Sequence, residues 1–281
     1  MERIGVIGLG RMGSAIAQRY GAQGYPVCGW TRSGRTIDGV HAAADLGALV
    51  AVSDTIILSL LDDTAVATVL DHLMTCDLQG RQIIDTSTVV PALLTDRIGA
   101  IRAKQATAVD APISGGPEMV LAGTCGVFIG GTDAAAARAT AILGVMSGRI
   151  FHVGPLGAGL VMKVINNGML QAYFNGLTDL LPLARRAGLP LETALDILCG
   201  GPAGIPMLTA RLPKVLGTDT DVGFAIAAAS KDNDVFQRVM QEFGLTSAML
   251  EIAGARQRDA IAAGMGENDV AAMIASAYRH G

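Results

Sequence analysis

The chain has 281 residues, of which 51% are hydrophobic, 16% are charged and 4% are aromatic. This much apolar mass buries a large core, suggests about two domains and excludes intrinsic disorder. The net charge is −4 and there is no long basic run. Nucleic acid, which usually needs a positive binding surface, is therefore not an expected partner.

The longest stretch without a charged residue, 164–178, is interrupted by four amide side chains. A membrane-spanning helix needs about 20 apolar residues, so we expect no membrane span or membrane partner. The first residues enter a strand pattern and do not have the pattern of a signal peptide. Four cysteines and four histidines are scattered without a CxxC pair. This spacing predicts reduced thiols, a cytoplasmic location and no metal site.

Strands and helices alternate through the first half of the chain. We expect strands at 3–8, 26–30, 55–61, 82–85, 106–111, 126–130 and 150–153, and helices at 11–23, 63–74, 91–104 and 133–147. Asp63 is a candidate N-cap of the second helix. Continuous apolar runs such as 55–61 are typical of strands buried on both faces. Helices between such strands imply crossovers and a mainly parallel sheet.

The pattern changes near residue 154. No strand is expected beyond it, and helices are expected at 158–187, 191–199, 224–243, 247–263 and 268–277, with Gly and Pro between them. The predicted fold class is therefore α/β: a doubly wound domain at 1–155, followed by an all-α domain at 156–281 that begins with a long connecting helix.

A GxGxxG motif lies between the first strand and the first helix, where a dinucleotide-binding loop belongs. Gly8 permits the tight turn, Gly10 lets the backbone approach a pyrophosphate, and Gly13 allows close packing of helix on strand. The helix N-terminus then offers N–H groups to the phosphates. The alternative is a glycine-rich turn without a ligand. The predicted cofactor residues here are Gly8, Leu9, Gly10, Arg11, Met12 and Gly13.

The loop after the second strand favours NADP over NAD. An NAD site usually has an acidic residue at this position, but no carboxylate occurs here before Asp38. Arginine makes planar, charge-assisted contacts with phosphate oxygens, which suits a 2′-phosphate. Alternatively, these arginines are solvated loop charges. NADP is the predicted cofactor, and NAD is expected to bind with lower preference. The predicted contacts are Thr31, Arg32, Ser33 and Arg35.

Residues 110–116 end a strand at the carboxyl edge of the predicted sheet, where ligands bind in doubly wound folds. Ser114 supplies a hydroxyl, and Gly115 and Gly116 expose backbone N–H groups, so the segment is a candidate cradle for the carboxylate of a small substrate. The alternative is an ordinary strand-to-helix turn.

Two further clusters carry lysine. Lys163 and Asn167 are four residues apart and share a helix face, with apolar neighbours around the lysine. The alternative is a surface lysine that extends to water. Lys231 lies in the middle of a predicted helix, where an ion-pair face is the alternative.

The segments GLGRMG, DTST, DAPISGG, GAGLVMKVINN and SKD occur in that order between Gly8 and Asp232. This order resembles the β-hydroxyacid dehydrogenase family, which includes 3-hydroxyisobutyrate dehydrogenase, tartronate semialdehyde reductase and glyoxylate/succinic semialdehyde reductase. The resemblance implies a Rossmann-type domain, a helical domain and assembly as a homodimer or homotetramer.

The resemblance also implies residue roles. Lys163 is the implied catalytic acid/base, and the implied substrate contacts are Ser114, Gly115, Gly116 and Asn167. Leu60 and Leu61 lie along the cofactor, Thr88 contacts its nicotinamide side, and Lys231 reaches the cofactor from the helical domain. The segment 31–33 is similar to the Asn-Arg-Ser/Thr signature of NADPH-preferring members, with Thr in place of Asn. The segment 202–207 is similar to a stretch of the semialdehyde reductases, and Asn233 replaces a residue that is usually apolar.

The expected function is hydride transfer between a nicotinamide cofactor, preferably NADPH, and a small β-hydroxyacid or semialdehyde acid. One alternative is an imine reductase of the same architecture, although those relatives usually lack a lysine at position 163. A second alternative is a non-catalytic dinucleotide-binding module.

Overall fold

The structure is a computed structural model that describes residues 1–280. It divides into two compact units, Met1–Ile165 and the chain from Asn166 onward. The division falls inside the long helix α8 (Ala158–Arg186). The predicted boundary after residue 155 lies shortly before this point, in the turn that precedes α8.

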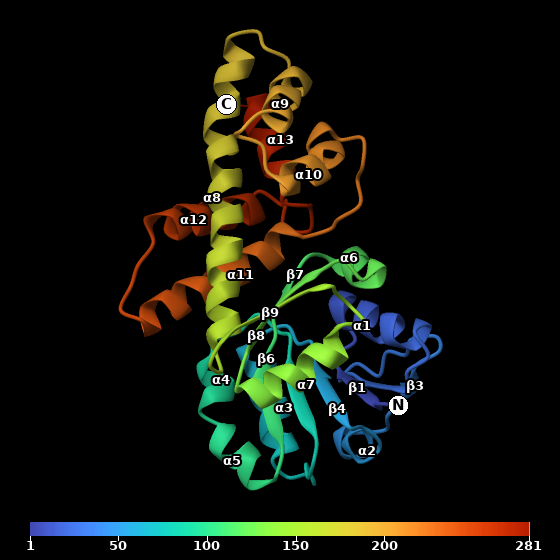
Figure 1. The fold of residues 1–281 in the computed structure, drawn as a ribbon. Coiled ribbons are helices and arrows are strands. Elements are labelled where there is room, and N and C mark those ends of the chain that lie inside the picture. The colour runs from blue at the N-terminus through green and yellow to red at the C-terminus, as the bar shows by residue number, and fades with distance from the viewer. Residues whose placement is uncertain (281) are drawn as a thin grey trace. The chain divides into compact units, whose positions relative to one another are not determined.

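The first unit is built on one twisted sheet (Figure 1). Its strand order is β3-β2-β1-β4-β5-β6-β8-β7, and β9 pairs with β8. The pairs from β3 to β6 are parallel, whereas β8 runs antiparallel to β6 and β7. The mainly parallel sheet is confirmed. The strands are β1 (Ile4–Ile7), β2 (Val27–Trp30), β3 (His41–Ala42), β4 (Thr55–Leu58), β5 (Gln82–Asp85), β6 (Thr107–Asp110), β7 (Ile113–Ser114), β8 (Gly126–Gly130) and β9 (Arg149–Gly154).

Helices cover both faces of this sheet (Figure 1). One buried cluster joins Ile16 and Tyr20 to Leu143, and the other joins Leu49 and Leu70 to Ile101. Strands buried on both faces explain the continuous apolar runs of the sequence. The helices are α1 (Arg11–Ala22), α2 (Leu46–Val52), α3 (Asp63–Leu73), α4 (Ala92–Thr95), α5 (Ile98–Ala103), α6 (Pro117–Ala122) and α7 (Asp133–Leu143).

Several local expectations were wrong. The helix expected at 91–104 is split into α4 and α5, because the N–H of Arg97 bonds to Leu94 at the break and tightens the turn. The N-cap of α3 is Asp62, whose side chain accepts a hydrogen bond from the N–H of Ala65 at 2.8 Å, and not Asp63. The short elements β3, α2, β7 and α6 were not expected.

The second unit is helical, and no strand occurs between residues 155 and 280. After α8 come α9 (Leu191–Gly200), α10 (Pro206–Leu216), α11 (Ile226–Glu242), α12 (Ala248–Ala262) and α13 (Ala271–His280). Of these, α10 was not expected. The core of the second unit packs residues of α8, α9, α10 and α13 together, including Leu181, Leu195 and Ile274. The fold class is therefore confirmed.

The unusual Asn233 is fully buried in the second unit and hydrogen-bonded. Its Nδ2 donates to Gln171 Oε1 at 2.6 Å and to the Leu250 carbonyl at 3.0 Å, and its Oδ1 accepts from Gln237 Nε2 at 2.5 Å. A buried amide is tolerated because its polar atoms find partners. It ties α8, α11 and α12 together.

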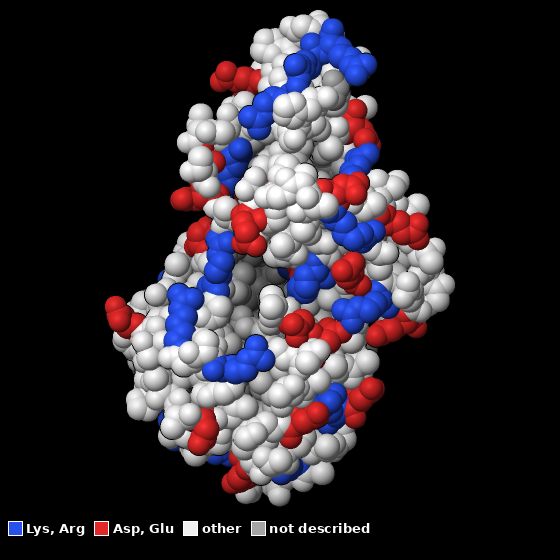
Figure 2. All heavy atoms as spheres, turned by 180° about the vertical axis from the view of Figure 1, so that it is seen from behind, with Lys and Arg blue, Asp and Glu red and all other residues white. Residues whose placement is uncertain are grey.

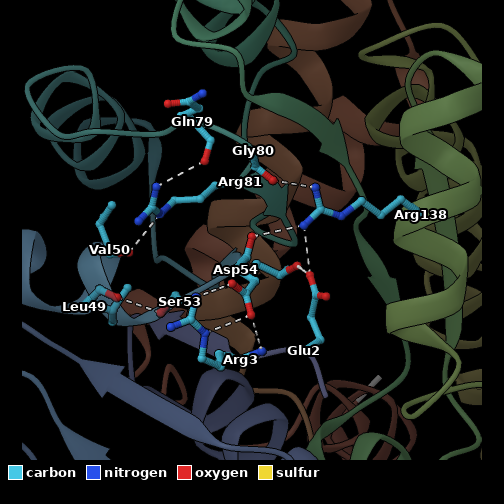
Figure 3. Close-up of polar contacts among 11 residues, drawn as sticks. Glu2, Arg3, Leu49, Val50, Ser53, Asp54, Gln79, Gly80, Arg81 and Arg138 are labelled. Atoms are coloured by element: carbon cyan, nitrogen blue, oxygen red, sulfur yellow. Dashed lines mark hydrogen bonds and ion pairs between the residues drawn. The ribbon is translucent and has the colours of Figure 1, made fainter.

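An ion-pair network joins the amino ends of β1 and β4 (Figure 3). Arg3 contacts Asp54 through two nitrogens, at 3.0 and 2.5 Å, and Arg138 contacts Glu2 at 2.9 Å. This network lies at the edge of the sheet opposite to the carboxyl ends of the strands and supports the fold.

Lys and Arg are interspersed with Asp and Glu on the face shown in Figure 2. Within residues 1–280, none of the helices combines the length and apolar character needed to cross a membrane.

Candidate functional site

The turn between β1 and α1 is very tightly built. Gly8 has φ +95°, a conformation that favours glycine, and a Cβ atom on Gly13 would come within 1.8 Å of the Gly8 carbonyl oxygen. A Cβ on Gly10 would instead meet no atom of the described chain within 4 Å, apart from its neighbours. The first and third glycines therefore serve the close packing of the turn, and the second leaves the backbone open to a ligand.

The N-terminus of α1 faces this open position. Gly10 is its N-cap, and within residues 1–280 no side chain caps this helix. The first turn carries no acidic residue. Uncapped N–H groups at a helix start bind anions, and the helix dipole adds to the attraction. The loop thus fits the pyrophosphate of a dinucleotide. Leu9 is buried, Met12 is half-buried and Arg11 is exposed beside it.

Charged side chains follow the end of β2. A tight turn links the Gly34 N–H to the Thr31 carbonyl at 3.0 Å, which leaves Arg32, Ser33 and Arg35 exposed. Exposed guanidinium groups at this position can contact a phosphate group. Asp38 lies further along the same exposed loop.

The loop after β4 is held by the loop after β5. The N–H of Leu60 donates to Ser87 Oγ at 3.0 Å, and the N–H of Ser87 donates to Asp85 Oδ1 at 2.9 Å. Leu60 also approaches Gly8, so the two loops meet at the cofactor turn. Leu61 is 72% exposed, which is unusual for leucine and suits a surface that a ligand covers. Thr88 is half-buried in the same region.

Two buried carboxylates end neighbouring strands. Asp85 of β5 and Asp110 of β6 are register partners, and they are 2% and 1% exposed. Burial raises the pKa of Asp85 to about 6; the hydrogen bonds from Ser87 oppose this shift and the charge of Asp110 adds to it. Burial also raises the pKa of Asp110, against the N–H bonds that it accepts from Gly157 and Leu160.

The cradle expected at 114–116 is formed by β7 and the start of α6. Ser114 is half-buried, Gly115 has φ +136°, and Gly116 is the N-cap of α6. A Cβ on Gly116 would come within 2.2 Å of Glu118 Oε1. The carboxylate of the exposed Glu118 therefore lies directly beside this glycine.

Arg19 joins the cofactor helix to the cradle helix. From α1, its Nε donates to the Val145 carbonyl at 2.8 Å and its Nη1 to the Leu121 carbonyl at 3.2 Å. The guanidinium group lies against Gly123, which ends α6 with φ +76°. The two helices that frame the candidate site are thus connected by one side chain.

Lys163 is buried in the second turn of α8, with only 7% of the residue exposed. Its Nζ donates to the Ile113 carbonyl at 2.5 Å, in the short strand that ends at Ser114. The start of α8 is held by Asp110, which accepts hydrogen bonds from the N–H of Gly157 at 2.6 Å and of Leu160 at 2.8 Å. A buried, fixed amine beside the candidate cradle is suited to proton transfer. The solvated-lysine alternative for Lys163 is wrong.

Asn167 and Lys231 belong to the second unit. Asn167 Oδ1 accepts from Asn166 Nδ2 at 2.9 Å, and Lys231 pairs with Asp232 at 2.6 Å within α11. Their expected contacts with substrate and cofactor stay predictions. The described residues contain no group of three or more His, Cys, Asp or Glu side chains placed to hold a metal ion.

In the first unit, the GxGxxG turn, Leu60 and the loop after β5 lie together. Lys163 lies beside the 110–116 segment. Asp85 and Asp110 place these two groups at the ends of neighbouring strands. Sequence reasoning missed the roles of Asp85, Ser87 and Asp110. The available signal was that each aspartate directly ends a buried strand.

Two family models together match almost the whole chain. The NAD binding domain of 6-phosphogluconate dehydrogenase matches residues 3–154, and the NAD-binding domain of NADP-dependent 3-hydroxyisobutyrate dehydrogenase matches residues 157–277. With the fold and the glycine turn, they define an NAD(P)-dependent dehydrogenase that acts on CH–OH groups. The chain belongs to the β-hydroxyacid dehydrogenase family, as the motif order indicates.

Curated relatives match over nearly their full length. The chain is 29% identical to 2-(hydroxymethyl)glutarate dehydrogenase of Eubacterium barkeri, over 97% of this chain and 93% of the relative. It is 28% identical to the NAD-dependent L-serine dehydrogenase of Pseudomonas aeruginosa, over 96% and 95%. The fold is similar to that of Mycobacterium tuberculosis 3-hydroxyisobutyrate dehydrogenase with L-serine, with a TM-score of 0.89 at 24% identity, covering 98% of this chain and 99% of that one.

Proposed function

We propose that the chain is an NADPH-preferring oxidoreductase that interconverts small β-hydroxyacids and the corresponding semialdehyde acids, with Lys163 as general acid/base. The observation that carries this proposal is the buried amine of Lys163, bonded to the strand that leads into Ser114. Lysine is rarely buried in proteins. A buried lysine amine that is held in place at the carboxyl edge of a nucleotide-binding sheet is therefore a candidate for a catalytic role.

The nicotinamide, when bound, supplies or accepts the hydride. The residues of the chain orient the substrate and move one proton. In the reducing direction, the ammonium group of Lys163 donates a proton to the oxygen on which negative charge develops. In the oxidising direction, the neutral amine takes the hydroxyl proton. The hydrogen bond from Nζ to Ile113 fixes the position of the amine in both directions.

The cofactor proposal has two parts. The glycine turn and the uncapped start of α1 hold the pyrophosphate, and Leu60, Leu61 and Thr88 line the remaining length of the cofactor. Arg32 and Arg35, with Thr31 and Ser33, would hold a 2′-phosphate. The chain would therefore bind NADPH in preference to NADH. Lys231 would add a cation to the cofactor from α11.

The substrate proposal depends on the cradle. Ser114, with the N–H groups of Gly115 and Gly116, would fix the substrate carboxylate, and Asn167 would bind the rest of the substrate. Both substrates named for the relatives, 2-(hydroxymethyl)glutarate and L-serine, carry a hydroxymethyl group on the same carbon as a carboxylate, so the carboxylate lies one carbon away from the carbon that bears the hydroxyl. We therefore propose a small carboxylate-bearing substrate.

An imine reductase is the second candidate, because the imine reductase of Myxococcus stipitatus has a similar fold, with a TM-score of 0.64 at 23% identity. Turnover of cyclic imines without turnover of semialdehydes would favour it. The two are separated by one panel that contains a cyclic imine, glyoxylate, and the semialdehydes of succinate, methylmalonate and tartronate. L-Serine and 3-hydroxyisobutyrate are assayed in the opposite direction.

The decisive test is Lys163→Ala, measured with NADPH and the best aldehyde of that panel. We expect kcat to fall by about 10²- to 10⁴-fold, the usual contribution of a general acid, while NADPH affinity by fluorescence is unchanged. Lys104→Ala is the matched control, because Lys104 also donates to a backbone carbonyl, that of Cys76 at 2.9 Å, and has no proposed role. Unchanged turnover in Lys163→Ala would remove this lysine from the mechanism.

We also propose a homodimer or homotetramer in the cytoplasm. Exposed apolar residues on α8, such as Leu180 and Leu183, support self-association, and the four free cysteines support a reducing compartment. Light scattering of the purified protein measures the mass of the assembly.

A further inference from the structure

We propose that Asp110 is a positioning residue for Lys163: its buried carboxylate holds the first turn of α8 and thereby sets where the lysine amine lies. The inference rests on the proposed function, since that function gives Lys163 its chemical role. Asp110 itself contacts backbone N–H groups at the start of α8 and is not proposed to contact the substrate.

The contact between Asp110 and α8 is specific at both carboxylate oxygens. Oδ1 accepts from the Gly157 N–H at 2.6 Å, and Oδ2 accepts from the Leu160 N–H at 2.8 Å. These are N–H groups that a helix start leaves without partners, and a carboxylate is their strongest acceptor. Asp110 thus fixes the helix by two bonds that do not share an oxygen.

Glycines make room for this arrangement. A Cβ on Gly159 would come within 2.7 Å of Asp110 Oδ2 and 2.3 Å of the Phe128 carbonyl oxygen. A Cβ on Gly130 would come within 2.3 Å of Asp110 Oδ1. The helix start therefore lies against β6 and β8 at a separation that only glycine permits, and a shift of the carboxylate would move the helix.

The same short segment holds α8 a second time. Three residues after Asp110, the Ile113 carbonyl accepts from Lys163 Nζ at 2.5 Å. Residues 110–113 thus fix both the helix start and the amine one turn further along. Loss of the attachment at Asp110 loosens the helix start, so the amine that the helix carries one turn further along shifts relative to Ile113 and the 114–116 segment.

The neighbouring Asp85 lies in a different hydrogen-bonding environment from Asp110. Asp85 Oδ2 has no hydrogen-bond partner among residues 1–280, whereas both oxygens of Asp110 accept N–H bonds at a helix start. Two buried, register-paired carboxylates disfavour double ionisation. The N–H bonds from Gly157 and Leu160, together with the dipole of α8, favour the charged form of Asp110.

The test is Asp110→Asn, which keeps the shape of the side chain but replaces one acceptor oxygen by a donor that faces an N–H. We expect kcat to fall about 100-fold, the cost of misplacing a catalytic group by about 1 Å, with NADPH affinity unchanged. Asp45→Asn is the matched control: Asp45 caps α2 by accepting from the Ala48 N–H at 2.7 Å. Because Asn caps a helix about as well as Asp, this variant should leave both the melting temperature and kcat per folded molecule nearly unchanged.

A double-mutant comparison shows whether Asp110 acts through Lys163. In Lys163→Ala, exogenous ethylamine replaces the missing amine without attachment to α8. Asp110→Asn should therefore have little effect on the amine-restored rate. An equal loss in both backgrounds, or wild-type kcat in the single variant, overturns the inference. Wild-type turnover of Lys163→Ala would overturn the proposed function instead.

If Asp110→Asn yields no folded protein, Asp110→Ser, which retains one neutral acceptor, is assayed in the same two backgrounds. A loss of kcat confined to the Lys163 background supports the inference, and a loss in both backgrounds contradicts it.

Discussion

Asp85 and Asp110 stand opposite one another in the register of β5 and β6, and both are almost completely buried. One member of this pair holds the loop that reaches Leu60, and the other holds the start of α8. The loop that approaches the glycine turn and the helix start that carries Lys163 are thus supported by adjacent residues of one sheet.

Asp85→Asn should change the pH dependence of stability. Burial raises the pKa of Asp85 from 3.8 to about 6, so between pH 4 and pH 6 the folded chain holds a proton that the unfolded chain has released. The free energy of unfolding therefore falls as the pH rises through this window, by up to about 3 kcal/mol. Urea unfolding between pH 4 and pH 7 should show that the variant lacks this fall. A variant with the slope of the wild type would contradict the assignment.

Asp54→Asn should change the pH dependence of stability in the opposite direction from Asp85→Asn. The hydrogen bond and charge of Arg3 lower the pKa of Asp54 from 3.8 to about 2, so its stabilisation is present above pH 4 and is lost as the pH falls toward 2. Because both side chains are partly exposed, we expect a loss of only about 1 kcal/mol at pH 7. Wild type and variant should have the same stability near pH 2, and a difference that persists there would exclude this pair as its source.

Gly13→Ala should destabilise the first unit, because its Cβ would come within 1.8 Å of the Gly8 carbonyl oxygen. Gly21→Ala is the matched control in the same helix, since its Cβ meets open space within the described residues. The control should raise stability by about 0.5–1 kcal/mol, the usual gain for Gly to Ala in a helix. Thermal unfolding measures both. A harmless Gly13→Ala would mean that helix and strand are further apart than described.

Arg32→Ala should weaken NADPH far more than NADH. Loss of a charge-assisted contact to a phosphate typically lowers affinity by about 10- to 100-fold, and NADH has no 2′-phosphate to lose. Arg102→Ala, at an exposed arginine of α5, is the control and should change neither KM. Equal effects of Arg32→Ala on both cofactors would show that Arg32 does not read the 2′-phosphate.

Glu118→Gln should lower KM for carboxylate-bearing substrates. The carboxylate of Glu118 lies beside Gly116, where it repels an incoming anion, and the amide keeps the shape without the charge. We expect a several-fold decrease in KM that shrinks in high salt, with little change in kcat. A KM that rises would indicate that Glu118 assists the substrate, for example through an amino group.

The sequence predicted the elements whose patterns are local. The strands predicted from apolar runs at 82–85 and 126–130 have the same bounds as β5 (Gln82–Asp85) and β8 (Gly126–Gly130). The helix predicted at 158–187 differs from α8 by one residue at its end. The lysine of that helix was identified by its family motif. Its burial and its bond to Ile113 depend on packing that no local pattern contains.

The missed features depend on distant partners. Asp110 bonds to N–H groups 47 and 50 residues further along the chain, and its sequence neighbours give no sign of this. The strands β3 and β7 have two residues each, too few for a periodic pattern to appear. Such elements form because neighbouring strands offer them hydrogen bonds, which is a property of the assembled sheet.

Arg19 couples α1 to α6 and to the segment that follows α7. Its guanidinium group bonds from the dinucleotide helix to the Leu121 and Val145 carbonyls, and Gly123 leaves room for it. A chimera that imports the nucleotide-binding half of a relative would need to import residues 117–145 with it. An exchange of α1 or of α6 between relatives must therefore preserve the contacts of this one arginine.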